Sequence, residues 1–502
     1  RPVTGWSLRE MKPPLSSALW RQVILAAVHW MLGLFVGGVA VLLFVVDSMP
    51  DLDVWHQAQF RHEYNHQQHR AFRTLQQYQT LEQQLFQELQ AQVYDRVDTA
   101  ALPDVHRFHR GSPVDPTAYT ENWNRSREFS VANPRAAVLL LHGLSDSPYS
   151  LRQLAQTLHA SQSHVVLLRL PGHGTAPAAL TRVSVEDFKA AVRLAARHLR
   201  QQVGPDVPLF VVGYSSGGAL AVEYALAQLA GEPLPELAGL VLISPAMGVS
   251  RLAVLASWQR RLSYLPGLGK LAWQAVQPEF DPYKYNSFPL NAAEQVYDLT
   301  QDIAVRLEQL QNQGRLGDFP PTLVFSSAVD ATVSVSALID GLMMKLASHR
   351  HRLVLYDVHQ RANSAFLFTD EARQVAQQAL SRSLPFTLDI LSNGPADNDQ
   401  LVRMIKPAGT DAVELVRTDL QWPDELYSLS HVALPFAPWD RVYGDVPHVN
   451  GKPESLGNVT LRGERGILQV PINQLMRLRY NPFYAYQETE IHAFILGQTS
   501  AN

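Results

Sequence analysis

The sequence predicts an α/β fold for its middle part, with a mostly parallel sheet covered by helices. Between residues 136 and 382, short apolar runs alternate with helical patterns, which is typical of parallel strands joined by helical connections. A segment rich in aromatic residues, 247–320, interrupts this alternation and suits a cap over a pocket. The expected strands are Ala137–Leu141, Val165–Arg169, Leu209–Gly213, Leu240–Ser244, Thr322–Ser326 and Leu353–Tyr356.

Composition narrows the classes of function. A chain of 502 residues has room for a catalytic domain with appended segments, and 46% hydrophobic with 18% charged residues is a globular composition. The formal net charge of −4 offers no basic excess for binding nucleic acid. The absence of cysteine excludes disulfides, thiolate metal sites and a cysteine nucleophile.

The N-terminal region predicts a single-pass membrane anchor. The apolar run 23–46 is long enough to cross the ~30 Å hydrocarbon core of a bilayer, and it is longer than the ~7–15 residue apolar region of the alternative, a cleaved signal peptide. Basic residues precede the run and acidic residues follow it, which places residues 1–22 in the cytoplasm and the remainder outside, in the periplasm if the source is Gram-negative. Gly33 and Gly37 form a GxxxG motif through which two copies could dimerise.

Residues 55–100 predict an amphipathic, glutamine-rich helix. Apolar side chains recur there every three or four residues. We interpret the segment as a helical stalk that could bind a protein partner, with a coiled-coil strand and a helix lying against the catalytic domain as alternatives.

The strongest chemical signal is the pentapeptide Gly213-Tyr214-Ser215-Ser216-Gly217. It follows an apolar strand and precedes the helical run 219–230, so Ser215 would sit on a sharp strand-to-helix turn that requires small flanking residues. Such a turn presents the hydroxyl group to a base. We therefore predict Ser215 to be a nucleophile.

A second apolar strand ends in His142-Gly143-Leu144 and predicts an oxyanion loop. In such sites the backbone N–H after the nucleophile, here of Ser216, acts together with an N–H of this loop, here of Leu144. We expect His142 itself to be structural.

These motifs, together with Leu170-Pro171-Gly172-His173-Gly174, resemble the α/β-hydrolases of the lysophospholipase and monoacylglycerol-lipase type. The resemblance covers about half of the chain, here residues 130–384. It implies hydrolysis of a carboxylic ester, such as a lipid ester, through an acyl-enzyme, without a metal or organic cofactor. It also implies a triad in the order Ser, Asp, His. Residues 385–502 would extend the same sheet or form a small lobe.

The resemblance places the acidic residue of the triad at Asp330, in the turn after the strand Thr322–Ser326. Two histidines compete for the role of base. His359 follows the strand Leu353–Tyr356, where the family has its histidine. His431 ends another strand-like run, in a block that resembles the C-terminal part of some membrane-anchored bacterial hydrolases. The sequence leaves both open.

Two hypotheses from other classes stay open. His62-Glu63-Tyr64-Asn65-His66 fits the HExxH pattern of zinc peptidases, although its flanks are polar rather than apolar. The chain could also be a non-catalytic, membrane-anchored scaffold on a hydrolase fold.

Overall fold

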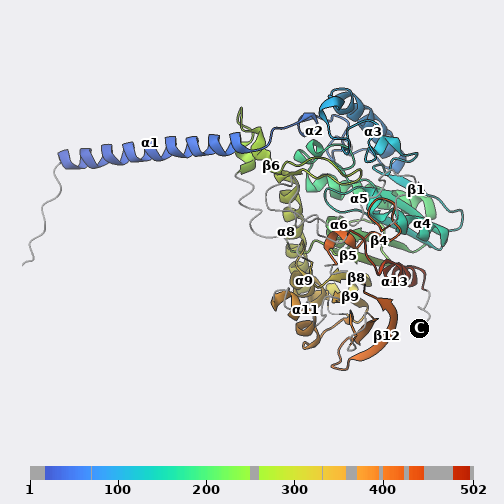
Figure 1. The fold of residues 1–502 in the computed structure, drawn as a ribbon. Helices are drawn as coiled ribbons and strands as arrows, with labels where there is room; N and C mark the ends of the chain where they lie inside the picture. The colour runs from blue at the N-terminus through green and yellow to red at the C-terminus, as the bar shows by residue number, and fades with distance from the viewer. Residues whose placement is uncertain are drawn as a thin grey trace, which may run out of the picture.

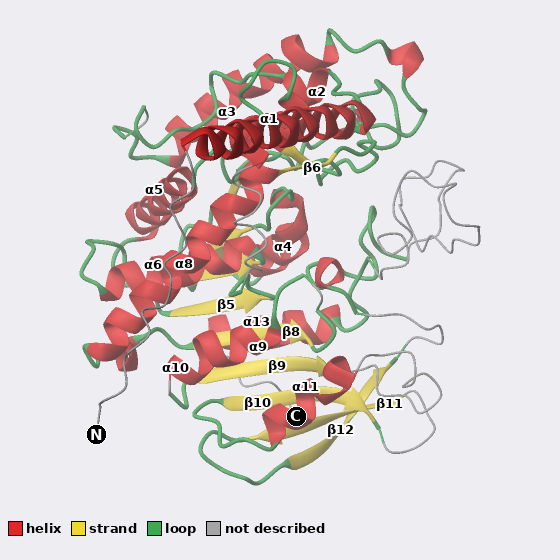
Figure 2. Cartoon of the chain, turned by 90° about the vertical axis from the view of Figure 1, so that its left-hand side faces the viewer, coloured by secondary structure: helices red, strands yellow, loops and turns green. Residues whose placement is uncertain are grey.

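The computed structural model describes residues 17–68, 70–248, 259–330, 332–346, 348–357, 370–394, 400–422, 429–445 and 479–497. Within them, ten strands form one sheet in the order β1-β3-β2-β4-β5-β8-β9-β10-β11-β12. The strands β2, β3, β4, β5, β8, β9 and β10 run parallel, whereas β1, β11 and β12 are antiparallel to their neighbours. Figure 2 shows β5, β8, β9 and β10 in succession, with β11 and β12 at the lower edge.

Every strand expected from the apolar runs is present. The bounds are β1 Arg127–Phe129, β2 Ala136–Leu141, β3 Ser163–Leu168, β4 Leu209–Tyr214, β5 Gly239–Ile243, β8 Thr322–Ser327, β9 His351–Asp357, β10 Thr387–Asn393, β11 Gln400–Lys406 and β12 Glu414–Gln421. The central strands are buried on both faces, which is why they read as continuous apolar runs.

Helices cover both faces of the sheet. The helices are α4 Arg152–Ala160, α5 Val185–Val203, α6 Ser216–Leu229, α8 Leu290–Asn312, α9 Val335–Leu338, α10 Met344–Leu346, α11 Asp370–Leu380 and α13 Tyr484–Leu496. Leu139 and Leu141 of β2 pack in one core with α5, α6 and α8. Val138 and Leu140 point the other way and pack with α4 and α13. The sheet is therefore the middle of three layers.

The described part of the C-terminal region extends this sheet. The strand β10 pairs with β9, and α13 returns to the same domain, where Arg352 of β9 forms an ion pair with Glu490 (2.6 Å). The strands β11 and β12 lack the continuous apolar runs that mark the central strands. Both strands lie near the open edge, where one face meets water and the apolar run is broken by polar residues.

Over residues 55–100 the structure has the alternative in which a helix lies against the catalytic domain, and it contradicts the predicted projecting stalk. The structure has the short helix α2 (Val54–Gln57), loops, and α3 (Leu75–Leu89), and these lie on the domain (Figure 1). Leu75 and Tyr78 are fully buried in the main core, and the Tyr78 hydroxyl donates to the Arg169 carbonyl oxygen (2.8 Å). The apolar stripe of this helix is the face that packs on the domain. The sequence could not show this, because the apolar periodicity of a packed helix is the same as that of a free one.

We expect Tyr78→Ala to lower the free energy of unfolding by about 3–5 kcal/mol, since it removes a fully buried aromatic side chain. The exposed Gln83 on the same helix provides the matched control, Gln83→Ala. Thermal unfolding of the full-length protein in detergent measures both. Equal melting temperatures for the two variants would contradict the burial of Tyr78 and would favour the projecting stalk.

The N-terminal helix α1 (Ser17–Ser48) contains the predicted span 23–46. Its residues Trp20–Ser48 are long and apolar enough to cross a membrane, and the helix projects away from the body of the protein (Figure 1). Its last turn contacts the cap region, where Val46 packs against Leu268 and Leu271. The Lys270 ammonium group also donates to the Met49 carbonyl oxygen (2.8 Å).

Candidate active site

Ser215 occupies the sharp turn between β4 and α6. Its backbone lies at φ 54° and ψ −119°, a strained conformation for a residue with a side chain. The flanking glycines are required by close backbone approach: a Cβ at Gly213 would lie 2.3 Å from the Gly217 carbonyl oxygen, and a Cβ at Gly217 would lie 2.2 Å from that of Leu141. The turn predicted from the sequence is therefore present, and it aims Ser215 into a pocket.

Asp330 and His431 meet although 101 residues separate them. Nδ1 of His431 lies 2.8 Å from Oδ2 of Asp330, and both side chains are buried. The other carboxylate oxygen of Asp330 accepts hydrogen bonds from the N–H groups of Thr332 (2.8 Å) and Val333 (3.0 Å). This network fixes the carboxylate and orients the imidazole ring.

The electrostatic environment keeps Asp330 ionised. Burial by itself raises the pKa of this carboxyl group, but the charge and hydrogen bond of His431 and the two N–H groups outweigh burial, so the pKa lies below its ordinary value of 3.8. An ionised carboxylate can hold the Nδ1–H tautomer and stabilise an imidazolium ion.

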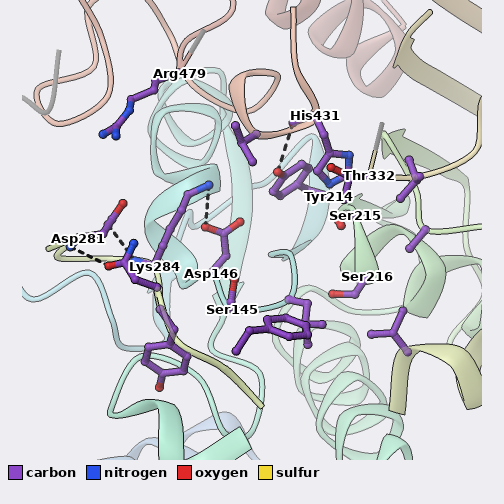
Figure 3. A pocket seen from close by; sticks show the side chains of 18 of the residues that line it. Ser145, Asp146, Tyr214, Ser215, Ser216, Asp281, Lys284, Thr332, His431 and Arg479 are labelled. Atoms are coloured by element: carbon purple, nitrogen blue, oxygen red, sulfur yellow. Dashed lines mark hydrogen bonds and ion pairs between the residues drawn. The ribbon is translucent and has the colours of Figure 1, made fainter. Parts of the chain in front are cut away.

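His431 begins a short helical turn, His431–Ala433, on the face of the sheet that α4 and α13 cover. The Tyr214 hydroxyl, one residue before Ser215, donates to the His431 carbonyl oxygen (3.3 Å). Ser215 and His431 line the same pocket (Figure 3). The competing candidate, His359, lies outside the described residues.

The two residues of the expected oxyanion hole also belong to the wall of this pocket. Leu144 and Ser216 both line it, and within the described part of the chain neither backbone N–H donates to another protein group. His142 is fully buried beneath the loop: its Nε2 accepts from the Leu170 N–H (3.0 Å), while Nδ1 lies 2.8 Å from the Gly143 carbonyl oxygen. Its role in shaping the loop matches the expectation.

The pocket has a cavity volume of about 400 Å³ and lies against the cap region. Cap residues between 280 and 296 line one side, and two short strands, β6 (Trp273–Ala275) and β7 (Phe288–Pro289), brace the loop between them. The predicted cap 247–320 is too long at its end. Most of α8 packs on α6 beside the sheet, with Leu299 and Ile303 in the main core.

Several charged residues line the pocket, and no sequence motif predicted them. Asp146, Asp281, Lys284 and Arg479 gather on one side of the pocket, apart from Ser215 and His431 (Figure 3). Asp146 closely follows Leu144 in the sequence, so its position near the oxyanion loop could have been predicted. The other three come from the cap and the C-terminal region, and only the fold brings them together.

The HExxH hypothesis is wrong. Residues 61–66 form bends and turns rather than the helix that a zinc site of this type requires. Glu63 is paired with the buried Arg169 (2.9 Å), and His66 lies 2.9 Å from Asp187. Among the described residues, no group of three or more histidine and acidic side chains could hold a metal ion.

The cap loop depends on the buried carboxyl group of Glu279. Its oxygens accept hydrogen bonds from the N–H groups of Asn286 (3.0 Å) and Ser287 (2.8 Å). Burial raises the pKa of Glu279 to about 7, although these N–H groups and the charge of Arg107 act in the opposite direction. The folded state therefore binds this proton more tightly than the unfolded state, whose ordinary pKa is 4.5.

Protonated Glu279 consequently stabilises the folded protein at acidic pH. This stabilisation is lost as the pH rises through about 7. Between pH 5 and pH 8, we expect the free energy of unfolding of the unmodified protein to fall by about 2.5 kcal/mol relative to Glu279→Gln. Denaturant unfolding of both proteins at the two pH values tests this. A difference that does not change with pH would contradict it.

Comparison with known proteins agrees with the geometry. Residues 132–359 match the serine aminopeptidase S33 family. This chain has the α/β-hydrolase fold. It is 28% identical over 206 residues to the thermostable monoacylglycerol lipase of Bacillus sp. (strain H-257), covering 41% of this chain and 74% of that enzyme. It is 32% identical over 131 residues to the monoglyceride lipase of Mus musculus, covering 25% of this chain and 41% of that enzyme.

Among solved structures, the α/β-hydrolase is similar to the monoacylglycerol lipase of Paleococcus ferrophilus. That similarity has a TM-score of 0.35 at 18% identity, covering 51% of this chain and 98% of that one. The sequence relatives and the S33 match support a carboxylester hydrolase.

Proposed function

We propose that this α/β-hydrolase is a membrane-anchored serine esterase that cleaves a lipid ester through an acyl-enzyme on Ser215. The observation that carries the proposal is the hydrogen bond between His431 and Asp330 beside the strained turn of Ser215. These three residue types in this chain order match the expected triad. The monoacylglycerol lipases among the sequence relatives support a lipid ester as substrate.

The reaction would proceed in two halves. His431 removes the hydroxyl proton of Ser215 as the oxygen attacks the ester carbonyl carbon, and Asp330 stabilises the imidazolium ion that forms. The N–H groups of Leu144 and Ser216 hold the oxyanion, each worth about 3 kcal/mol in the barrier. The imidazolium ion then protonates the departing alcohol, and water activated by His431 releases the fatty acid.

An apolar wall supports an acyl chain in this pocket. Side chains of Ala246, Phe288, Ala293, Val296 and Val333 line it. Apolar lining of this kind binds a hydrocarbon chain by removing it from water.

We also propose that α1 anchors the protein, with the catalytic domain outside the cytoplasm. Its length, its apolar composition and its exposure in the structure support an anchor, and the basic residues before it support the orientation. Dimerisation through Gly33 and Gly37 remains a prediction.

The test is hydrolysis of p-nitrophenyl esters by the full-length protein in neutral detergent micelles. We expect kcat/KM for the decanoate to exceed that for the acetate by at least about tenfold, because burial of only two further methylene groups, at ~0.8 kcal/mol each, already corresponds to that factor. We also expect chelators to have no effect. Failure to hydrolyse any ester would favour the non-catalytic scaffold instead.

A further inference from the structure

The oxyanion loop is a tight turn that Asp146 closes. The N–H of Asp146 donates to the Gly143 carbonyl oxygen (3.3 Å), so residues 143–146 form the turn that carries Leu144. Ser145 lies at φ 61°, a left-handed conformation that costs free energy in a residue with a side chain. Such a conformation persists only where surrounding contacts hold it. The position of the Leu144 N–H therefore depends on what packs against this turn.

Two neighbouring residues of the cap hold the turn. The Tyr285 N–H donates to the Ser145 carbonyl oxygen (2.8 Å). The ammonium group of Lys284 lies 3.2 Å from Oδ1 of Asp146 (Figure 3). The other oxygen of this carboxylate, Oδ2, faces Gly143, where an added Cβ would lie 3.1 Å from it. The carboxylate of Asp146 thus lies between the cap lysine and the turn.

The cap segment that carries these two residues is itself anchored to the domain. Arg107, which is almost fully buried, donates to the Lys284 carbonyl oxygen (3.2 Å). The Tyr285 hydroxyl donates to the Gly172 carbonyl oxygen (3.1 Å) and accepts from the Thr175 N–H (2.8 Å). Because these contacts hold the cap segment independently of the oxyanion loop, the cap segment can fix the position of the loop.

The ion pair between Lys284 and Asp146 is largely removed from water. The two side chains are 16% and 6% exposed, respectively. Charges buried in this way are tolerated only when they are closely paired, and separating them is strongly unfavourable. The pair therefore favours the arrangement in which the cap and the oxyanion loop are in contact.

We propose that Lys284 and Asp146 form a latch through which the cap positions the oxyanion loop, an inference that rests on the ester hydrolysis proposed above. Lys284 holds Asp146, Asp146 holds the turn, and the turn presents the Leu144 N–H to the oxyanion. Both are positioning residues, because they act through the loop rather than on the substrate. The oxyanion forms only on the way to the transition state, so loss of the latch lowers kcat rather than substrate affinity.

The experiment measures inhibition of the full-length protein, in neutral detergent micelles, by decyl trifluoromethyl ketone. Ser215 adds to the ketone carbon, His431 takes the serine proton, and the ketone oxygen becomes an oxyanion held as in the transition state. We expect Lys284→Met and Asp146→Asn each to raise the inhibition constant by about 10–100-fold, less than complete loss of a donor at ~10²–10³-fold. kcat/KM for p-nitrophenyl decanoate should fall by the same factor, while KM changes less than about threefold.

Three further variants sharpen the comparison. Lys189→Met breaks the ion pairs of a buried lysine with Glu186 and Asp302, outside the pocket lining, and should leave the inhibition constant unchanged. Lys284→Arg keeps the positive charge and should bring the inhibition constant to within about threefold of that of the unmodified protein. The double variant Asp146→Asn with Lys284→Met should be no weaker than either single variant, because the two residues act as a pair.

An unchanged inhibition constant in folded Lys284→Met or Asp146→Asn would overturn the latch, even if kcat fell. A purely structural role lowers the amount of folded enzyme, and an inhibition constant does not depend on that amount. Recovery of activity in the double variant would also overturn it, since the harm would then come from an unpaired carboxylate. In either case ester hydrolysis by the unmodified protein would leave the proposed esterase standing. A protein that neither hydrolyses an ester nor binds the ketone would remove both proposals. Asp146→Asn decides if Lys284→Met does not fold.

Discussion

Replacing Ser215 by alanine is expected to lower kcat for ester hydrolysis by about 10⁴–10⁶-fold, because the reaction then lacks the group that forms the acyl-enzyme. Residual hydrolysis would come from the Leu144 and Ser216 N–H groups and from substrate binding. Steady-state hydrolysis of p-nitrophenyl decanoate measures the loss.

Ser215→Gly is the matched variant, because it also removes the hydroxyl group but relieves the backbone. Ser215 lies at φ 54°, and glycine adopts such angles freely. We expect Ser215→Gly to be as inactive as Ser215→Ala yet more stable than the unmodified protein, by about 1–3 kcal/mol. Activity retained by either folded variant would refute the role of Ser215.

The second large effect concerns the base. His431→Ala is expected to lower kcat by about 10⁴-fold or more, and Asp330→Asn by about 10³–10⁴-fold, since the imidazole would lose its position and tautomer. The 2.8 Å contact between His431 and Asp330 is the reason to choose this histidine. His359→Ala should change kcat by less than about threefold, the range expected of a residue outside the reaction.

The same assay compares these variants, with thermal unfolding as the control for folding. If His359→Ala is inactive and His431→Ala is active, the triad would have to be rebuilt around His359. Loss of activity in both folded variants would mean that the segment containing His359 also supports the site.

Much of the site follows from local chemistry. The turn at Ser215 and the strands beside it could be predicted because only glycine fits at positions 213 and 217, and because buried parallel strands leave continuous apolar runs. Asp330 could be placed by resemblance, since it follows a strand at a fixed position.

Other features depend on contacts between distant segments. His431 and His359 look alike in the sequence, and only the approach of the C-terminal region to Asp330 favours one of them. The apolar stripe of residues 75–89 would look the same in a free stalk and in a packed helix. The burial of Tyr78 therefore could not be predicted from the sequence pattern. No sequence motif marks Lys284 or Arg479, because only the folded chain brings these two residues to the same pocket.

The most direct test of the proposed triad is covalent labelling with a fluorophosphonate, located by peptide mass spectrometry. We expect one adduct, on Ser215, in the unmodified full-length protein and in His359→Ala, and labelling at least about 10³-fold slower in His431→Ala, because the serine would lack its base. An adduct on another residue, or labelling of Ser215 that is indifferent to His431, would contradict the mechanism.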